Sequence, residues 1–150
     1  MAATATHEPA TTGPGEGLRC VVVTPERAVL DEPADFVALP MYDGELGVLH
    51  GRAPLIGRLG YGELRLRRGA ATKRFFVDGG FAQVRADVVS VLTERAIPAE
   101  NIDERAATQV LESSHPAAET LEARAAHAKA QERARAQLRV ARHTHEPAHF

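Results

Sequence analysis

The chain has a single cysteine, no surplus of basic residues and no long apolar run. With Cys20 alone it cannot form an internal disulfide, and the apolar neighbours of Cys20 predict a buried thiol. The formal charge of -2 argues against non-specific binding of nucleic acid. No segment approaches the roughly 18 apolar residues of a membrane span, and the N-terminus lacks an apolar signal core. We therefore expect a soluble, intracellular protein without direct membrane insertion.

Catalytic and metal-binding motifs are also missing. The glycine-rich stretch at residues 44–55, GELGVLHGRAPL, matches neither phosphate-loop spacing and leads into more strand. There is no G-x-S-x-G nucleophile motif, and His143, His145 and His149 stand without an HExxH motif or a cysteine pair that would fix a metal geometry. We expect no catalytic residue, no metal site and no cofactor, so the chain is predicted not to be an enzyme.

The texture of the sequence divides the chain into four parts. Residues 1–17 are small, polar and rich in Gly, Pro and Thr, which predicts a disordered leader. Residues 18–97 form short β-rich runs separated by turn signals at residues 68–69, 78–80 and 85–87. Leucine and arginine alternate at residues 64–67, as in a half-buried strand. This pattern predicts an antiparallel β-sandwich or flattened barrel of about 8–10 strands, mainly β with an α appendage.

The α appendage is predicted at residues 98–143, followed by a tail at 144–150. Asn101 is the expected N-cap of a first helix, with Glu104 as its capping-box partner. Ile102, Ala106 and Val110 would share one face of that helix. The interruption at residues 113–116 ends it, and a second helix is predicted from about residue 116 to about residue 143.

The second helix carries a regular stripe of small residues. Alanine side chains bury little area each, so at about 25 cal/mol per Å² the hairpin is expected to be held weakly and to be able to detach. The stripe consists of Ala123, Ala126, Ala130, Ala134, Leu138 and Ala141.

Basic residues concentrate on the same helix. Between residues 124 and 142 they outnumber the one acid, Glu132, by five. Two interpretations stay open: a solvated helix face, or a docking surface for an acidic partner. The basic residues are Arg124, Lys129, Arg133, Arg135, Arg139 and Arg142.

The stretch at residues 44–55 is predicted to be a tight surface loop. Its glycines permit close backbone approach, and Pro54 fixes the entry to the next strand. Leu46, Val48 and Leu55 would anchor it to the core. Glu45, His50 and Arg52 would then point outward.

Several motifs, in order along residues 18–143, resemble the epsilon subunit of F-type ATP synthases, which is called delta in mitochondria. They are TPERAVL at residues 24–30, ALP at 38–40, GELGVLHGRAPL at 44–55, GELR at 62–65, FVDGGF at 76–81 and VVSVL at 88–92. The helical segment AQLRVA at 136–141 is similar to the family's second helix. The central motif is far more specific than an isolated glycine pattern.

The resemblance implies a non-catalytic rotor subunit of a proton-translocating ATP synthase, peripheral on the cytoplasmic face of the cell inner membrane. Its implied partners are the gamma subunit, the c-ring and the catalytic alpha/beta hexamer. The hairpin would inhibit ATP hydrolysis when extended, with its basic residues near acidic loops of the catalytic subunits. The implied c-ring and gamma interface comprises Gly44, Glu45, Leu46, Gly47, His50, Gly51, Arg52 and Pro54.

Two departures from the family pattern affect these expectations. The usual P-G-H of the central loop is His50-Gly51-Arg52 here. The I-D-x-x-R-A motif is one residue shorter, which moves Arg105 about 100° around the helix. Asp103 and Arg105 are the candidate nucleotide-binding residues, and the shift predicts that the isolated subunit binds no ATP tightly.

Two other classes of function stay open from the residues alone. One is a free-standing β-sandwich interaction module with a helical dimerisation arm. The other is a small enzyme that uses a polar residue of the central loop.

Overall fold

The computed structural model describes residues 17–113 and 120–145. The predicted leader up to residue 16, the tail from residue 146 and most of the interruption between the helices lie outside the described residues. Among the described residues, no helix is both long and apolar enough to cross a bilayer.

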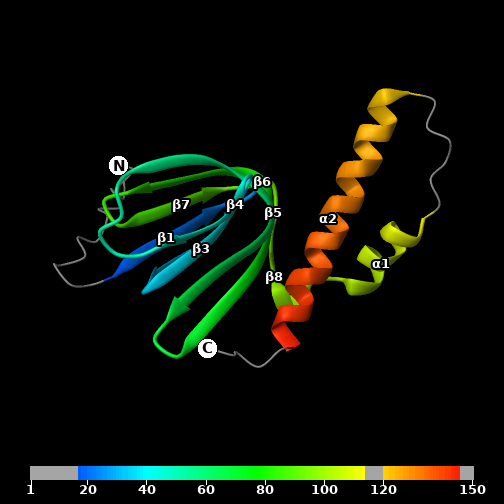
Figure 1. The fold of residues 1–150 in the computed structure, drawn as a ribbon. Coiled ribbons are helices and arrows are strands. Elements are labelled where there is room, and N and C mark those ends of the chain that lie inside the picture. The colour runs from blue at the N-terminus through cyan, green and yellow to red at the C-terminus, as the bar shows by residue number, and fades with distance from the viewer. Residues whose placement is uncertain (1–16, 114–119, 146–150) are drawn as a thin grey trace, which may run out of the picture.

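The first part of the chain folds as a β-sandwich (Figure 1). The strand order is β2-β1-β7-β6-β5-β3-β4, with β8 paired to β6. The pairs are antiparallel except β1 and β7, which run parallel. The strands are β1 (Leu18–Val23), β2 (Ala28–Ala34), β3 (Phe36–Met41), β4 (Gly44–Val48), β5 (Leu55–Arg68), β6 (Ala71–Arg85), β7 (Val88–Leu92) and β8 (Ala96–Pro98).

Strands β5 and β6 are long, at 14 and 15 residues. The turn predicted at residues 78–80 is wrong, because β6 continues through it with a bend. Gly79 and Gly80 supply the bend with φ values of 66° and 105°. A Cβ on Gly80 would collide with the carbonyl oxygen of Leu92. Because of the bend, β6 pairs with β8 before the glycines and with β7 after them.

The core lies between the layers of the sandwich and follows the predicted alternation. Leu64 and Leu66 are 0% and 2% exposed, while Arg65 and Arg67 lie on the other face of β5. Cys20 is fully buried, as predicted. Burial, with smaller contributions from nearby carboxylates, raises the pKa of its thiol to about 12.

The first helix starts later than predicted. A 3-10 turn, η1 (Ala99–Asn101), contains Asn101, and the amide of Ile102 is still bonded to the carbonyl of Ala99. Asp103 is therefore the N-cap of α1 (Glu104–Glu112), accepting a hydrogen bond from the Ala106 amide at 3.0 Å. The predicted face is also wrong, because Ala107 is buried whereas Ala106 and Val110 are exposed.

The second helix, α2 (Leu121–His145), packs on the sandwich only through its C-terminal half (Figure 1). Its N-terminal end extends away from the sheet, and Ala123 and Ala126 of the predicted stripe are exposed. Ala134 and Ala141 of that stripe are buried. The buried cluster beneath α2, here called the α2 seam, consists of Phe76, Ala99, Ala136 and Val140.

Candidate functional site

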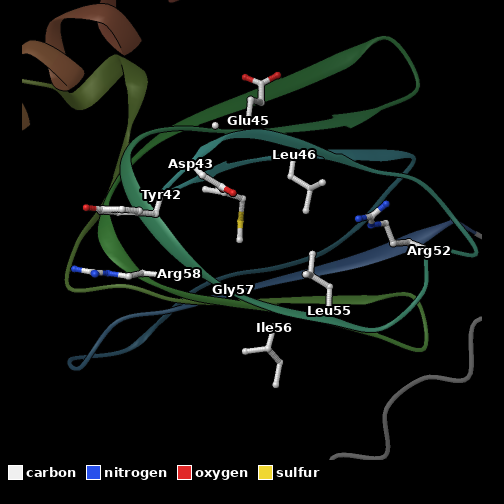
Figure 2. Close-up of a pocket in the computed structure, with 11 residues that line it drawn as sticks. Tyr42, Asp43, Glu45, Leu46, Arg52, Leu55, Ile56, Gly57 and Arg58 are labelled. Atoms are coloured by element: carbon white, nitrogen blue, oxygen red, sulfur yellow. The ribbon is translucent and has the colours of Figure 1, made fainter.

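A groove of about 570 Å³ opens between the β3–β4 turn and the start of β5 (Figure 2). Leu46 and Leu55 face each other across it, while Ile56 points away on the other side of β5. Gly57 gives the side chain of Met41 its space, because a Cβ at position 57 would collide with the Met41 methyl group. The lining is Met41, Tyr42, Asp43, Gly44, Glu45, Leu46, Arg52, Leu55, Ile56, Gly57 and Arg58.

The structure brings four of the predicted interface residues into this groove. They are Gly44, Glu45, Leu46 and Arg52, whereas Gly47, His50, Gly51 and Pro54 are not part of the lining.

The predicted anchoring of the glycine-rich stretch is confirmed. Val48 is fully buried, and Leu46 and Leu55 pack against the same core. Glu45 and Arg52 are exposed, as is His50. Much of the stretch is strand and not loop, because β4 occupies residues 44–48 and only residues 49–54 connect it to β5.

The glycines of this stretch have backbone or packing roles. Gly44 and Gly51 adopt φ values of 139° and 82°, which other residues rarely adopt. Gly47 lies under the ring of Phe36, where a Cβ would approach the ring to 3.0 Å.

Sequence reasoning missed an apolar row beside the groove. Ile56 is 72% exposed. Arg58, Phe81 and Leu92 are neighbours in register across β5, β6 and β7, and Phe81 and Leu92 are 58% and 57% exposed. We call Ile56, Phe81 and Leu92 the outer row. Strict alternation was the available signal, since inward Leu55 and Leu59 require Ile56 to face outward.

Aromatic and ionic contacts organise the rim of the groove. The Arg58 guanidinium lies 4.7 Å from the ring centroid of Tyr42, a cation–π distance. On the other side, Arg65 donates to Glu45 at 3.1 Å and to Glu63 at 3.3 Å. Glu45 is thus tied to its neighbouring strand although its side chain is 56% exposed.

Glu63 connects this region to the C-terminal helix. Its carboxylate, 9% exposed, accepts from Arg74 at 2.9 Å and lies 3.0 Å from Nδ1 of His143 on α2. The Glu63 carboxylate therefore has one partner on each of three elements: Arg65 on β5, Arg74 on β6 and His143 on α2.

A second carboxylate, that of Asp78, also contacts α2. Nε of Arg133 donates to Asp78 at 2.8 Å, and the guanidinium lies 5.1 Å from the Tyr61 ring centroid. Burial alone would lower the pKa of Arg133, but the hydrogen bond and charge of Asp78 outweigh it and raise that pKa. Arg133 is therefore a docking contact, not one more member of a uniform basic surface.

The other basic residues of α2 remain on the surface. Arg124, Lys129 and Arg139 are exposed, as are Arg135 and Arg142. This distribution separates one docking arginine from five residues that face solvent.

The candidate nucleotide residues do not converge. Asp103 caps α1, and Arg105 is exposed one position into that helix. Within residues 17–113 and 120–145, no three metal-ligating side chains come together. His143 contacts Glu63, and the side chains of His145 and His149 lie outside what the structure describes.

Comparison with known proteins agrees with this geometry. Residues 17–99 match the β-sandwich domain of the ATP synthase delta/epsilon chain. The chain is 59% identical over 126 residues to an ATP synthase epsilon chain of Rhodopirellula baltica, covering 83% of this chain and 98% of that one. It is 36% identical over 128 residues to the epsilon chain of Nitratidesulfovibrio vulgaris, covering 83% and 96%.

Solved structures show the same architecture. A chain of the Euglena gracilis mitochondrial ATP synthase, solved as OSCP/F1/c-ring, superposes with a TM-score of 0.72 at 25% identity, covering 91% of this chain and 88% of that one. A chain from the Tetrahymena thermophila mitochondrial ATP synthase central stalk and c-ring gives 0.57 at 14% identity, covering 83% and 96%, which supports the fold alone.

The sandwich, its exposed groove and the docked helices define a non-catalytic subunit built to contact other proteins. The chain belongs to the delta/epsilon chain family of the ATP synthase, as its sequence motifs predicted, and is a non-catalytic epsilon-type subunit of the central stalk.

Proposed function

We propose that the groove and the β4–β5 loop attach the sandwich to the polar loops of the c-ring, and that the outer row packs on the gamma subunit. Glu45 and Arg52 offer charges of both signs in one exposed depression, which suits polar loops. The exposed carbons of Ile56, Phe81 and Leu92 suit a partner that rotates together with this subunit and stays bound. The subunit would then transmit c-ring rotation to gamma within the alpha/beta hexamer, peripheral to the membrane.

The convergence of Glu45, Leu46 and Arg52 in one groove beside an exposed apolar row is the observation that carries this proposal. Glu45, Arg52 and the outer row do not belong to the sandwich core, so their exposure is not explained by packing of the fold. Large solvent-exposed apolar side chains that neighbour one another on a folded surface are typical of protein interfaces.

The double variant Glu45→Gln/Arg52→Gln tests the c-ring contact. We expect weaker attachment of the catalytic sector to the c-ring, with the thermal stability of the isolated subunit nearly unchanged because both side chains are exposed. Sedimentation of the catalytic sector with c-ring-containing membranes measures attachment, and thermal unfolding measures stability.

A matched control is available on the sandwich. Glu32 and Lys73 form another exposed acid–base pair, between β2 and β6, and they lie outside the groove. Glu32→Gln/Lys73→Gln should leave attachment normal. If the Glu45/Arg52 variant unfolds the isolated subunit while assembly at permissive temperature is normal, the loop is structural and the interface assignment is wrong.

We further propose that the α1–α2 hairpin inhibits ATP hydrolysis when it leaves the sandwich. The small α2 seam supports this proposal, as do the five exposed basic residues, which an acidic surface of the catalytic sector could attract. Partners can shift such an equilibrium only if they bind one form more tightly than the other.

Truncation tests the regulatory role. The cut belongs after Ile102 and not before Pro98, because β8 and η1 still contact β6. Removing residues from 103 onward should raise ATP hydrolysis by the reconstituted complex and leave assembly largely intact. Replacing Arg124, Lys129, Arg135 and Arg139 by Gln should reproduce part of this rise, more at low salt than at high salt. Equal hydrolysis rates with full-length and truncated subunit at every salt concentration would rule out inhibition.

A further inference from the structure

The β4–β5 loop is held by a carboxylate from the turn between β6 and β7. Oδ1 of Asp87, in the β6–β7 turn, accepts the amide hydrogen of Gly51 at 2.8 Å. Its other oxygen, Oδ2, lies 3.0 Å from Nδ1 of His50. One side chain therefore contacts two consecutive residues of the loop, immediately before Arg52.

The backbone of Asp87 is itself held by a neighbouring strand. Its backbone carbonyl accepts the Arg19 amide of β1 at 2.9 Å, so the β6–β7 turn is tied to the neighbouring parallel strand. Ala86 and Asp87 have φ values of 48° and 62°, the tight left-handed turn that leads directly into β7. The Asp87 side chain is 25% exposed, so it is only partly in solvent.

The loop has few other restraints of its own. The Arg52 amide reaches the Leu49 carbonyl at 3.3 Å, which is long for such a bond. Leu49 is 59% exposed, and residues 50–54 are exposed as well. The Asp87 contacts are therefore the main link between this loop and the rigid sheet.

We infer that Asp87 is the positioning residue of the β4–β5 loop, and that it presents Arg52 to the partner in a fixed direction. Gly51 has φ 82° and no side chain to restrain it, so the bond to its amide sets the direction in which the chain enters Arg52. A loop that is ordered before binding loses less conformational entropy on association. The partner role of Arg52 rests on the proposed function, whereas the hold on the loop does not.

The substitution Asp87→Gly removes the carboxylate and keeps the turn, because glycine adopts a positive φ without strain. We expect faster amide exchange at Gly51 in the isolated full-length subunit, and attachment to the c-ring weakened roughly three- to tenfold, the range set by ordering one or two loop residues on binding. Asp87→Asn keeps an acceptor oxygen for Gly51 and tolerates the left-handed φ, so it should restore most of both properties.

A matched carboxylate provides the control. Oδ2 of Asp35 accepts the Gly69 amide at 2.6 Å, in the β5–β6 turn at the other end of β5. Asp35→Gly should speed exchange at Gly69 and leave attachment unchanged. This control separates the loss of any carboxylate–glycine bond from the loss of the one at the proposed contact.

The outcomes distinguish the inference from the function on which it rests. Unchanged exchange at Gly51 in Asp87→Gly would overturn the hold on the loop, whatever the partner. Faster exchange with normal attachment, in a complex that Glu45→Gln/Arg52→Gln does weaken, would overturn the positioning role alone. If neither variant weakens attachment, the proposed c-ring contact is wrong and the positioning role falls with it.

Discussion

The sandwich and the hairpin are held by different kinds of contact. The sandwich has a continuous core of large side chains such as Leu18, Leu39 and Leu64, all fully buried. The α2 seam has one large fully buried side chain, Phe76, with Tyr61, Ile97 and Ile102 only partly buried against it. It is supplemented by the Arg133–Asp78 and His143–Glu63 contacts. Apolar burial is proportional to area, whereas the ionic contacts depend on geometry and on salt. We therefore expect the sandwich to stay folded under conditions in which α2 detaches.

Truncating a core side chain should destabilise the sandwich, and this change has the largest expected effect. Leu64→Ala leaves a cavity in a fully buried position and should lower the free energy of unfolding by about 2–5 kcal/mol. Urea denaturation of the isolated subunit measures it. Leu49→Ala, at a position 59% exposed, is the control and should stay within about 0.5 kcal/mol of the wild type. Equal losses for the two variants would contradict the core assignment.

Removing one arginine should release the hairpin without unfolding the sandwich. Arg133→Gln leaves the Asp78 carboxylate, 5% exposed, without its cation, and undocking α2 relieves that cost by returning the carboxylate to water. Since Arg133 is itself 34% exposed, we expect a moderate shift of about 1–2 kcal/mol toward the undocked form. Hydrogen exchange of α2 amides, compared with those of β5, measures the shift.

The control for this variant is Arg135→Gln on the same helix. Arg135 is exposed, and its side chain contacts Gln131 of α2 and not the sandwich. Exchange as fast in Arg135→Gln as in Arg133→Gln would show that helix charge, and not the Asp78 contact, holds α2.

The titration of the Cys20 thiol should change the stability of the sandwich with pH, and this is the smallest of the expected effects. Because burial raises the thiol pKa to about 12, the unfolded chain loses its proton at lower pH than the folded one. The stabilisation is thus complete below pH 8 and is lost as pH rises toward 12. By pH 9.5 the sandwich should be about 1 kcal/mol less stable from this group. Cys20→Ala should lack this part of the pH dependence, measured by urea denaturation between pH 8 and pH 10. An identical slope in the variant would contradict the assignment.

The sequence predicted the sandwich because its signals are local. Alternation at residues 64–67 requires only neighbours along one strand, and the structure confirms it. The turn at residues 85–87 is confirmed for the same reason, with Ala86 and Asp87 in the left-handed region. Turn residues misled at 78–80, because Gly-Gly is equally suited to a bend within a strand, and only the partners on both sides of β6 distinguish the two.

The hairpin was predicted less well because its docking depends on distant residues. The 3.6-residue period gives a stripe, but nothing in the helix says which part of the stripe meets the sheet, so the buried Ala136 was not predicted. The Asp78–Arg133 contact joins residues 55 positions apart. The Asn101 cap failed because the preceding 3-10 turn competes for the same residues.

The groove was predicted in part for a related reason. The motif at residues 44–55 contains Glu45, Leu46 and Arg52, and all three line the groove. Tyr42 and Arg58 reach the groove from flanking segments through the pairing of β3 with β5, and the motif does not include them. Asp87 reaches the loop from the β6–β7 turn, 36 positions along the chain.

The long pairing of β5 with β6 has a mechanical consequence. The two strands stay in register from Leu55 opposite Val84 to Arg68 opposite Ala71, apart from the bend at the glycines. A pull along these strands would load many ladder hydrogen bonds in parallel, so they would have to fail together. A pull that lifts α2 away from the sheet would load its contacts one after another. The subunit is thus expected to resist force along the β5–β6 axis far better than force that peels α2 from the sheet. A load carried by β5 and β6 would then leave the α1–α2 hairpin free to move independently of the sandwich.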